Sequence, residues 1–260
     1  MQNNDVAISI DSLRIEISGT VAVKNVSFEL FSGEALGLLG GNGSGKTSVL
    51  NAVCGIYPIT AGKVRLFGKP IASHRPDEII GLGVGRSLQS VASIKDLTLA
   101  EYVALGVAAA QQKSSISRAL PLPATIRFER EALQKARSVL DELSLARYGD
   151  VLLQDAPYGV RKLADVARVF ASQCRIVLLD EPTSGVGSED RAGLADVIRN
   201  WHLRQRASLI LIDHDVHFVA SICSRAVVLS SGEVLAEGEV KHVLSDEQVM
   251  RDFLGIEAES

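Results

Sequence analysis

The sequence is poor in cysteine. Its three cysteines, Cys54, Cys174 and Cys223, are odd in number, far apart and without the paired spacing of a metal site. This pattern suits free thiols in a reducing compartment and argues against a secreted domain held together by disulfides.

Long apolar runs are also missing. No uninterrupted run approaches the roughly 20 residues that a helix needs to span a bilayer. Met1 is followed by the polar residues Gln2 to Asp5, whereas a signal peptide needs a basic start and an apolar stretch there. We expect a cytoplasmic protein that touches membranes only through partners.

Positive charge is not in excess. Lysine and arginine number 27 against 31 aspartates and glutamates, which gives a formal net charge of -4. No overall basic field can attract nucleic acid or anionic lipid, so phosphates should be held locally and no nucleic-acid partner is expected. The 260 residues are 47% hydrophobic and 22% charged, which suffices for one substantial core, or a main core with a smaller subdomain.

What the sequence does contain is a phosphate-binding motif, GGNGSGKT, at Gly40 to Thr47. It matches the pattern of glycine, four free positions, glycine, lysine and serine or threonine. The apolar run Ala35 to Leu39 predicts a buried strand before it, and Thr47 to Val53 can begin a helix after it. Because strand, loop and helix are all present, a nucleoside triphosphate site is favoured over a glycine-rich turn with one exposed lysine.

Each residue type in this loop suits the binding of a triphosphate. The glycines let the backbone take positive φ angles and bring successive N–H groups close to phosphate oxygens at the positive end of the following helix. Lys46 can reach the β and γ phosphates, and the Thr47 hydroxyl can complete the shell of a Mg2+ ion that keeps most of its waters. The residues expected to contact the nucleotide here are Gly40, Gly41, Asn42, Gly43, Ser44, Gly45, Lys46 and Thr47.

Two stretches before the loop alternate apolar and polar residues, as half-buried strands do. They cover residues 6–17 and 21–28 and are separated by a Ser-Gly turn, which predicts an antiparallel sheet. Beyond the loop we expect an Ala61-Gly62 turn and then a further strand at 64–66.

From about Ser93 to Asp155 the pattern turns helical. It is clearest across Phe128 to Leu145, where one face carries Leu133, Ala136, Val139, Leu140 and Leu143. Two prolines interrupt this region, so it is predicted to be a compact helical insertion and not a second independent domain. Gly159 to Ala171 is a further amphipathic helix that leads directly into a strand.

Acidic residues follow two predicted strands. The strand Ile176 to Leu179 ends in Asp180 and Glu181, and an open α/β sheet presents catalytic groups at this edge. Asp180 can hold Mg2+ through its waters, and Glu181 can orient a water on the γ-phosphate, whereas the alternative is a pair of solvated loop acids. A second strand, Ser208 to Ile212, delivers His214 to the same edge. The other histidines are interpreted as surface or core residues.

Taken in this order, the phosphate loop, Gln89, a helix preceding the sequence LLDEPT, and His214 resemble the ATP-binding cassette (ABC) ATPases, the motor subunits of membrane transporters. The resemblance covers nearly the whole chain. It implies one α/β domain over 1–260, with a P-loop nucleoside triphosphatase core of the ABC type. The core and an antiparallel β subdomain would take up 1–92 and 156–260, and a helical subdomain insertion 93–155.

The same resemblance implies that the protein binds ATP and Mg2+ and hydrolyses ATP. Gln89 would sense both the ion and the attacking water, so that it joins Glu181 and His214 as a catalytic residue and Thr47 and Asp180 at the metal. In the family, two subunits face each other head to tail. Each ATP then lies between the phosphate loop of one subunit and the signature motif of the other, here at Tyr158 and Gly159.

Four positions depart from the family pattern. The aromatic residue that commonly stacks on adenine falls at about Ile17, which can offer only apolar contact. The signature usually written LSGGQ is Ala156-Pro157-Tyr158-Gly159-Val160, without the serine and the glutamine, and the dimer-contact loop Ser184-Gly185-Val186-Gly187 does not end in aspartate. We therefore favour a heterodimer with a second ABC ATPase subunit over a homodimer.

The Tyr-Gly pair in the signature, the length of the helical insertion and the ending Asp246 to Gly255 resemble the branch that energises import of branched-chain amino acids. Relatives in that branch take up other amino-acid-like solutes and urea. The implied partners are integral membrane permease subunits and a periplasmic or extracellular solute-binding protein, with this chain at the inner face of the cell membrane. The lipopolysaccharide-export ATPases share a similar ending, which leaves export as an alternative.

Two further classes remain open. Soluble cassette proteins of DNA repair or translation usually carry two cassettes or long coiled-coil inserts, and this chain has neither, nor a basic patch. A nucleotide-binding regulatory subunit that no longer hydrolyses ATP is suggested by the altered signature and by Gly187.

Overall fold

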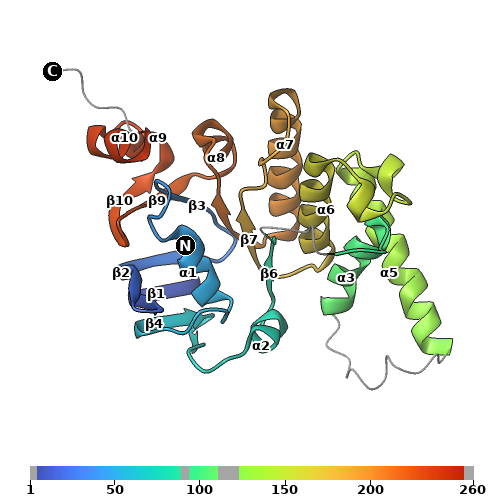
Figure 1. Ribbon diagram of the computed structural model, residues 1–260, viewed down its shortest axis with the longest axis horizontal. Helices are drawn as coiled ribbons and strands as arrows, with labels where there is room; N and C mark the ends of the chain where they lie inside the picture. The colour runs from blue at the N-terminus through green and yellow to red at the C-terminus, as the bar shows by residue number, and fades with distance from the viewer. Residues whose placement is uncertain (1–4, 89–93, 111–122, 255–260) are drawn as a thin grey trace.

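The computed structural model describes residues 5–88, 94–110 and 123–254 (Figure 1). These residues form a mixed α/β fold with one curled sheet. The strands follow one another in space in the order β5 (Lys69–Pro70), β4 (Ala61–Leu66), β1 (Val6–Ile17), β2 (Thr20–Phe31), β10 (Glu233–Glu239), β9 (Arg225–Ser230), β3 (Ala35–Leu39), β8 (Ser208–Ile212), β7 (Ile176–Asp180) and β6 (Val84–Arg86). The predicted α/β class is confirmed.

Helices pack on the sheet, and some of them project beyond it at one end of the molecule (Figure 1). They are α1 (Lys46–Val53), α2 (Pro76–Gly81), α3 (Leu99–Ala110), α5 (Pro123–Glu142), α6 (Tyr158–Ala171), α7 (Ser188–Gln205), α8 (Val216–Ile222), α9 (Val240–Val243) and α10 (Glu247–Leu254), with the 3-10 turns η1 (Ala146–Tyr148) and η2 (Leu153–Asp155). Within the described part of the chain, no helix combines the length and the apolar character needed to cross a membrane.

The strands β9, β3, β8, β7 and β6 form the parallel part of the sheet. Successive side chains of a strand face opposite sides, so Leu178 of β7 enters one hydrophobic core while Val177 and Leu179 enter the other. Because these strands are buried on both faces, their sequences read as unbroken apolar runs. They also share one direction, so β3, β7 and β8 all end at the same edge of the sheet, where the phosphate loop, Asp180 and Asp213 lie.

The strands β1, β2 and β4 form the antiparallel part. The pairing of β1 with β2 confirms the predicted antiparallel sheet, and Ile17 lies opposite Thr20 next to the hairpin turn. The predicted Ala61-Gly62 turn is wrong, because both residues belong to β4. Gly62 has φ +84°, and a Cβ there would lie 2.2 Å from the carbonyl oxygen of Ser12. The dipeptide therefore accommodates a register shift in the pairing with β1 instead of reversing the chain.

Helices α3 and α5 form the helical region predicted after the first strands, and they lie far from β1 and β2 (Figure 1). They pack against each other and against α6. On the predicted apolar face, Ala136 and Leu140 are fully buried. The contact between α3 and α6 is close, since a Cβ on Gly106 would lie 1.9 Å from the carbonyl oxygen of Arg168. The boundaries of a separate helical subdomain remain a prediction.

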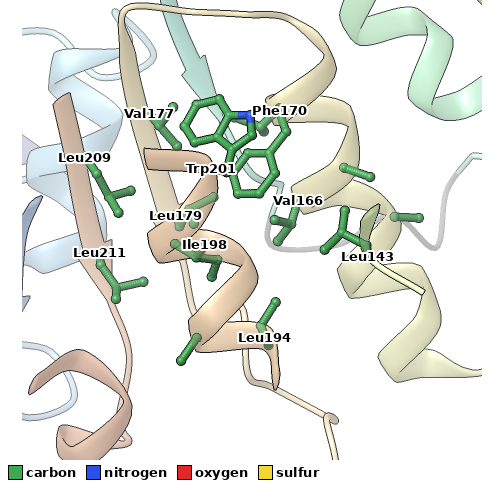
Figure 2. Close-up of a cluster of buried hydrophobic side chains, with 14 of the residues drawn as sticks. Leu143, Val166, Phe170, Val177, Leu179, Leu194, Ile198, Trp201, Leu209 and Leu211 are labelled. Atoms are coloured by element: carbon green, nitrogen blue, oxygen red, sulfur yellow. The ribbon is translucent and has the colours of Figure 1, made fainter. Parts of the chain in front are cut away.

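Helices α6 and α7 cover one face of the parallel strands. Phe170 of α6 stacks on Trp201 of α7, with the ring centroids 4.1 Å apart and the ring planes 5° apart. The two rings lie in the cluster that also takes up Val177 and Leu179 of β7 (Figure 2). This packing fixes α6 relative to β7, and the segments at the ends of both elements carry predicted site residues.

The three cysteines are free and buried, one in each of three places: the end of α1, the turn before β7 and the end of α8. Burial raises the pKa of the thiols of Cys54, Cys174 and Cys223. Each thiol therefore stays neutral at neutral pH. The prediction of free thiols is confirmed.

Candidate nucleotide site

The phosphate loop connects β3 to α1, in the strand, loop and helix arrangement that its sequence predicts. Gly40 has φ +143° and Gly45 has φ +105°. A Cβ on Gly40 would lie 2.2 Å from the carbonyl oxygen of Leu229 in β9, and one on Gly45 would lie 2.9 Å from that of Ala22 in β2. Only glycine fits these two positions, so the strands hold the loop closely on two sides.

Lys46 begins α1, and its side chain folds back over the loop. Its Nζ donates to the carbonyl oxygens of Gly40 at 2.7 Å and Gly41 at 2.8 Å. Burial lowers the pKa of Lys46, and the negative charges of Glu181 and Asp180 act against this shift. The ammonium group therefore lies near the two acids at the end of β7, and phosphate oxygens can replace the carbonyls as its partners.

Asp180 ends β7 with a carboxylate that is only 1% exposed. Its Oδ2 lies 3.2 Å from Nη2 of Arg86, and its N–H donates to the hydroxyl of Ser87 at 2.8 Å. A buried carboxylate and the Thr47 hydroxyl are hard oxygen donors of the kind that Mg2+ prefers, and the carboxylate already attracts a cation in Arg86. This donor set fits the ion. The described residues contain no cluster of three or more His, Cys, Asp or Glu side chains able to hold a metal.

Glu181 follows β7 in a left-handed backbone conformation, with φ +52°. Its N–H donates to the carbonyl oxygen of Ile212 at 2.8 Å, which ties the end of β7 to the end of β8. Its Oε1 lies 3.1 Å from Nε2 of His214, so two predicted catalytic side chains from neighbouring strands meet. Both line an open pocket of about 310 Å³ at this edge of the sheet.

Asp213 is buried and holds the loops around that pocket. It accepts hydrogen bonds from the Thr183 hydroxyl at 2.7 Å and the Thr183 N–H at 3.1 Å, and from the N–H of Asp215 at 3.0 Å. The loop after Glu181 is thereby fixed to the end of β8. The sequence placed Asp213 beside His214 but did not reveal this role, because its partner lies 30 residues earlier in the chain.

The predicted signature segment begins α6, with Pro157 at the N-cap and a half-exposed Tyr158 after it. A Cβ on Gly159 would lie 2.5 Å from the carbonyl oxygen of Gly185, and a Cβ on Gly185 would lie 2.2 Å from Cδ1 of the Tyr158 ring. The signature segment and the loop Ser184 to Gly187 are therefore in direct contact within one chain, although β7 separates them in sequence.

Ile17 and Gln89 are the remaining predicted site residues. Ile17 is half-buried at the end of β1 and packs against the core that includes the antiparallel strands. The paired strand β2 reaches the phosphate loop at Gly45, which places this hairpin beside the loop. Gln89 lies outside the described residues.

A buried polar network behind the acids was not predicted. Asp165 of α6 accepts hydrogen bonds from the Tyr102 hydroxyl at 2.5 Å, the Arg168 guanidinium at 2.9 Å and the N–H of Leu88. Burial and the charge of Asp165 raise the pKa of Tyr102, so the phenol keeps its proton. Arg168 also donates to the carbonyl oxygen of Arg86 at 2.7 Å. The sequence signal that could have pointed to this network is Asp165, an acid on the inward face of an amphipathic helix.

Parallel strands that bring a phosphate loop, an acidic pair and a histidine to one edge are the arrangement of a P-loop nucleotide-binding ATPase. The sequence pattern of the ABC transporter family matches residues 23–184. The chain therefore belongs to the ABC transporter family, as one of its ATPase subunits.

Two curated relatives and one solved structure illustrate the similarity. The high-affinity branched-chain amino acid transport ATP-binding protein LivG of Escherichia coli is 29% identical over 248 residues, covering 95% of this chain and 97% of that protein. The lipopolysaccharide export system ATP-binding protein LptB of Haemophilus influenzae is 28% identical over 249 residues, with the same coverage of 95% and 97%. A nucleotide-free ATP-binding cassette from an ABC transporter has a TM-score of 0.79 at 22% identity, covering 96% of this chain and 100% of that chain. This last likeness shows the fold alone.

Proposed function

We propose that this ATPase subunit drives the uptake of a small solute, a branched-chain or related amino acid, through a partner membrane permease. The observation that carries the proposal is the convergence at one sheet edge, where Lys46 lies near the two acids of β7 and Glu181 contacts His214. The solute is supported by the likeness to LivG, whose name gives branched-chain amino acid transport.

Each group of the site has one proposed task. Lys46 neutralises the β and γ phosphates, Glu181 accepts a hydrogen bond from the attacking water, and His214 contacts the γ-phosphate. Thr47 and Asp180 would hold Mg2+, which supplies further positive charge to the phosphates when bound. The other loop residues offer backbone N–H groups, Ile17 gives apolar contact to the base, and Gln89 adds a ligand from outside the described residues.

The proposed assembly is a heterodimer of ATPase subunits on a permease at the inner face of the cell membrane, with a solute-binding protein on the other side. Tyr158 and Gly159 would face the ATP of the second subunit, because the first N–H groups of a helix lack intrahelical partners and can bind a phosphate. Pro157 supports a heterodimer, since a second, different signature can supply the hydroxyl that this one lacks. A homodimer is the alternative.

Export is a second candidate, favoured by the similarity to LptB, which is 28% identical over nearly the whole chain. A regulatory subunit that binds ATP without hydrolysing it is a third, favoured by Pro157 and Gly187 in the segments expected at the dimer contact.

Purification of the tagged chain from detergent-solubilised membranes tests the function, with every copurified subunit identified by mass spectrometry. The complex is then reconstituted in proteoliposomes with ATP on the side of the ATPase and radiolabelled leucine, isoleucine or valine on the other. We expect ATP-dependent uptake of at least one of these amino acids, and its loss in Glu181→Gln. Copurification with a lipopolysaccharide-exporting complex would replace import by export, and ATP binding without turnover would favour the regulatory role.

A further inference from the structure

Arg86 has no task in the proposed function, although it lies against the carboxylate assigned to Mg2+. Its Nη2 is 3.2 Å from Oδ2 of Asp180, and its Nη1 is 2.5 Å from Oδ1 of Asn51 in α1. The side chains of Arg86 and Asp180 are 12% and 1% exposed. A largely buried ion pair therefore takes up the carboxylate that the ion needs.

The backbone around this pair is fixed independently of the guanidinium. The carbonyl oxygen of Arg86 accepts a hydrogen bond from Arg168 at 2.7 Å. Ser87 donates its N–H to Leu178 at 2.9 Å and accepts the N–H of Asp180 at 2.8 Å. The side chain of Arg86 can therefore leave Asp180 while β6 and β7 stay paired.

An ion bound to Asp180 changes the balance of charge around Arg86. Lys46 already lies near this carboxylate, so a doubly charged ion would add to two existing positive charges. An ion bound to Asp180 would lie close to the Arg86 guanidinium, whose Nη2 is 3.2 Å from the same carboxylate. Two positive charges this close repel strongly where water is largely excluded. Arginine cannot relieve the repulsion by losing a proton, since its pKa is too high. The guanidinium has to move away from the carboxylate.

We propose that Arg86 is a positioning residue that pairs with Asp180 as an internal cation while the site holds no ion, and releases it when Mg2+ enters with the nucleotide. The inference rests on the proposed assignment of Asp180 to the metal. Arg86 keeps the buried carboxylate neutralised and correctly oriented before ATP arrives. It also lowers the affinity for free divalent ions, so that ion binding depends on the negative charge that the triphosphate brings.

The first test measures Mn2+ binding to the full chain without nucleotide, with electron paramagnetic resonance reporting the free ion. Removal of the guanidinium takes away the cation that is paired with Asp180, so Arg86→Met should bind Mn2+ about tenfold or more tightly than the wild type. Arg225→Met is the matched control, because Arg225 is 19% exposed and pairs with Glu34 at 2.7 Å beside the start of β3, at the opposite sheet edge. It should bind Mn2+ like the wild type. An unchanged or weaker affinity in folded Arg86→Met overturns the proposal.

A second measurement uses the unaltered protein, because Arg86→Met also removes the partner of Asn51 and can weaken the fold. In the chain labelled with 15N-arginine, the Nε–Hε resonance of Arg86 is assigned by its loss in Arg86→Lys. It should shift on addition of Mg2+ to the ADP-bound protein and remain unchanged in Asp180→Asn. If the resonance does not shift when Mg2+ is added to the wild type, the proposed release of the carboxylate is wrong.

Asp180→Asn separates the two possible failures. If this variant binds Mn2+ with ADP as tightly as the wild type, Asp180 is not a ligand and the proposed site is wrong. If it loses Mn2+ binding while Arg86→Met gains none, the site stands and the role of Arg86 is wrong.

Discussion

Nε2 of His214 lies 3.1 Å from Oε1 of Glu181, across the ends of two neighbouring strands. The contact takes one oxygen of the carboxylate and leaves the other for a water. It also joins Glu181, which we assign to the attacking water, to His214, which we assign to the γ-phosphate. A change at either residue is therefore expected to disturb the orientation of the other.

Glu181→Gln is expected to keep ATP binding and lose turnover. Glutamine retains the shape and can still hydrogen-bond to His214, but its amide is a far weaker acceptor for a proton of the attacking water. We expect hydrolysis to fall by about a hundredfold or more, measured as phosphate release, with ATP affinity measured by calorimetry. Glu189→Gln, an exposed acid in the first turn of α7, serves as control. Turnover close to that of the wild type in Glu181→Gln would assign the water to another residue.

Lys46→Ala is expected to weaken ATP binding. The ammonium forms charge-assisted hydrogen bonds to the phosphates, and losing such a contact costs about 1.5 to 3 kcal/mol. In the structure Lys46 already donates to the carbonyl oxygens of Gly40 and Gly41. The bonds to phosphate replace these bonds, so the binding free energy lost in Lys46→Ala should lie near the lower value. Calorimetry with MgATP measures it, with Lys24→Ala on the exposed face of β2 as control. Equal affinities in the two variants would contradict the assignment.

Pro157→Ser is expected to speed ATP hydrolysis at the proposed composite site that contains this signature. A serine there can donate to the partner's γ-phosphate, and such a bond, if formed in the transition state, changes the rate by about tenfold to a hundredfold. The amides of Tyr158 and Gly159 can also hold the phosphate without a hydroxyl, so the effect has to be measured in the reconstituted complex. Glu181→Gln is compared there with the matching change in the partner ATPase. Equal losses from both glutamate changes, with no effect of Pro157→Ser, would make the two sites equivalent.

Tyr102→Phe is expected to lower the free energy of unfolding by about 1.5 to 3 kcal/mol, because it removes a hydrogen bond to the buried charged acid Asp165. Tyr148→Phe is the matched control, since its hydroxyl makes no hydrogen bond among the described residues of the same helical region. Urea unfolding followed by circular dichroism measures both. Equal midpoints would show that Arg168 and the N–H of Leu88 satisfy Asp165 without the phenol.

The strands and the phosphate loop could be predicted because their signals are local. The runs that form β3, β7 and β8 are apolar throughout, and the residues after them follow from the direction of parallel strands. The network of Tyr102, Asp165 and Arg168 could not be predicted in the same way, because Tyr102 and Asp165 are 63 residues apart in the chain. The prediction of a turn at Ala61-Gly62 was wrong for a related reason. Its glycine accommodates a close approach by β1, which only the folded sheet reveals.

The three buried cysteines can report where the native chain opens locally. With neutral, shielded thiols at the end of α1, before β7 and at the end of α8, the native protein should react with thiol reagents only when one of these regions opens. Mass spectrometry after timed labelling can then give a separate opening rate for each region, without any introduced probe. If nucleotide stabilises the phosphate loop, the labelling rate of Cys54 should fall the most when MgATP is added. Cys54 caps the end of helix α1, and this helix directly follows the loop.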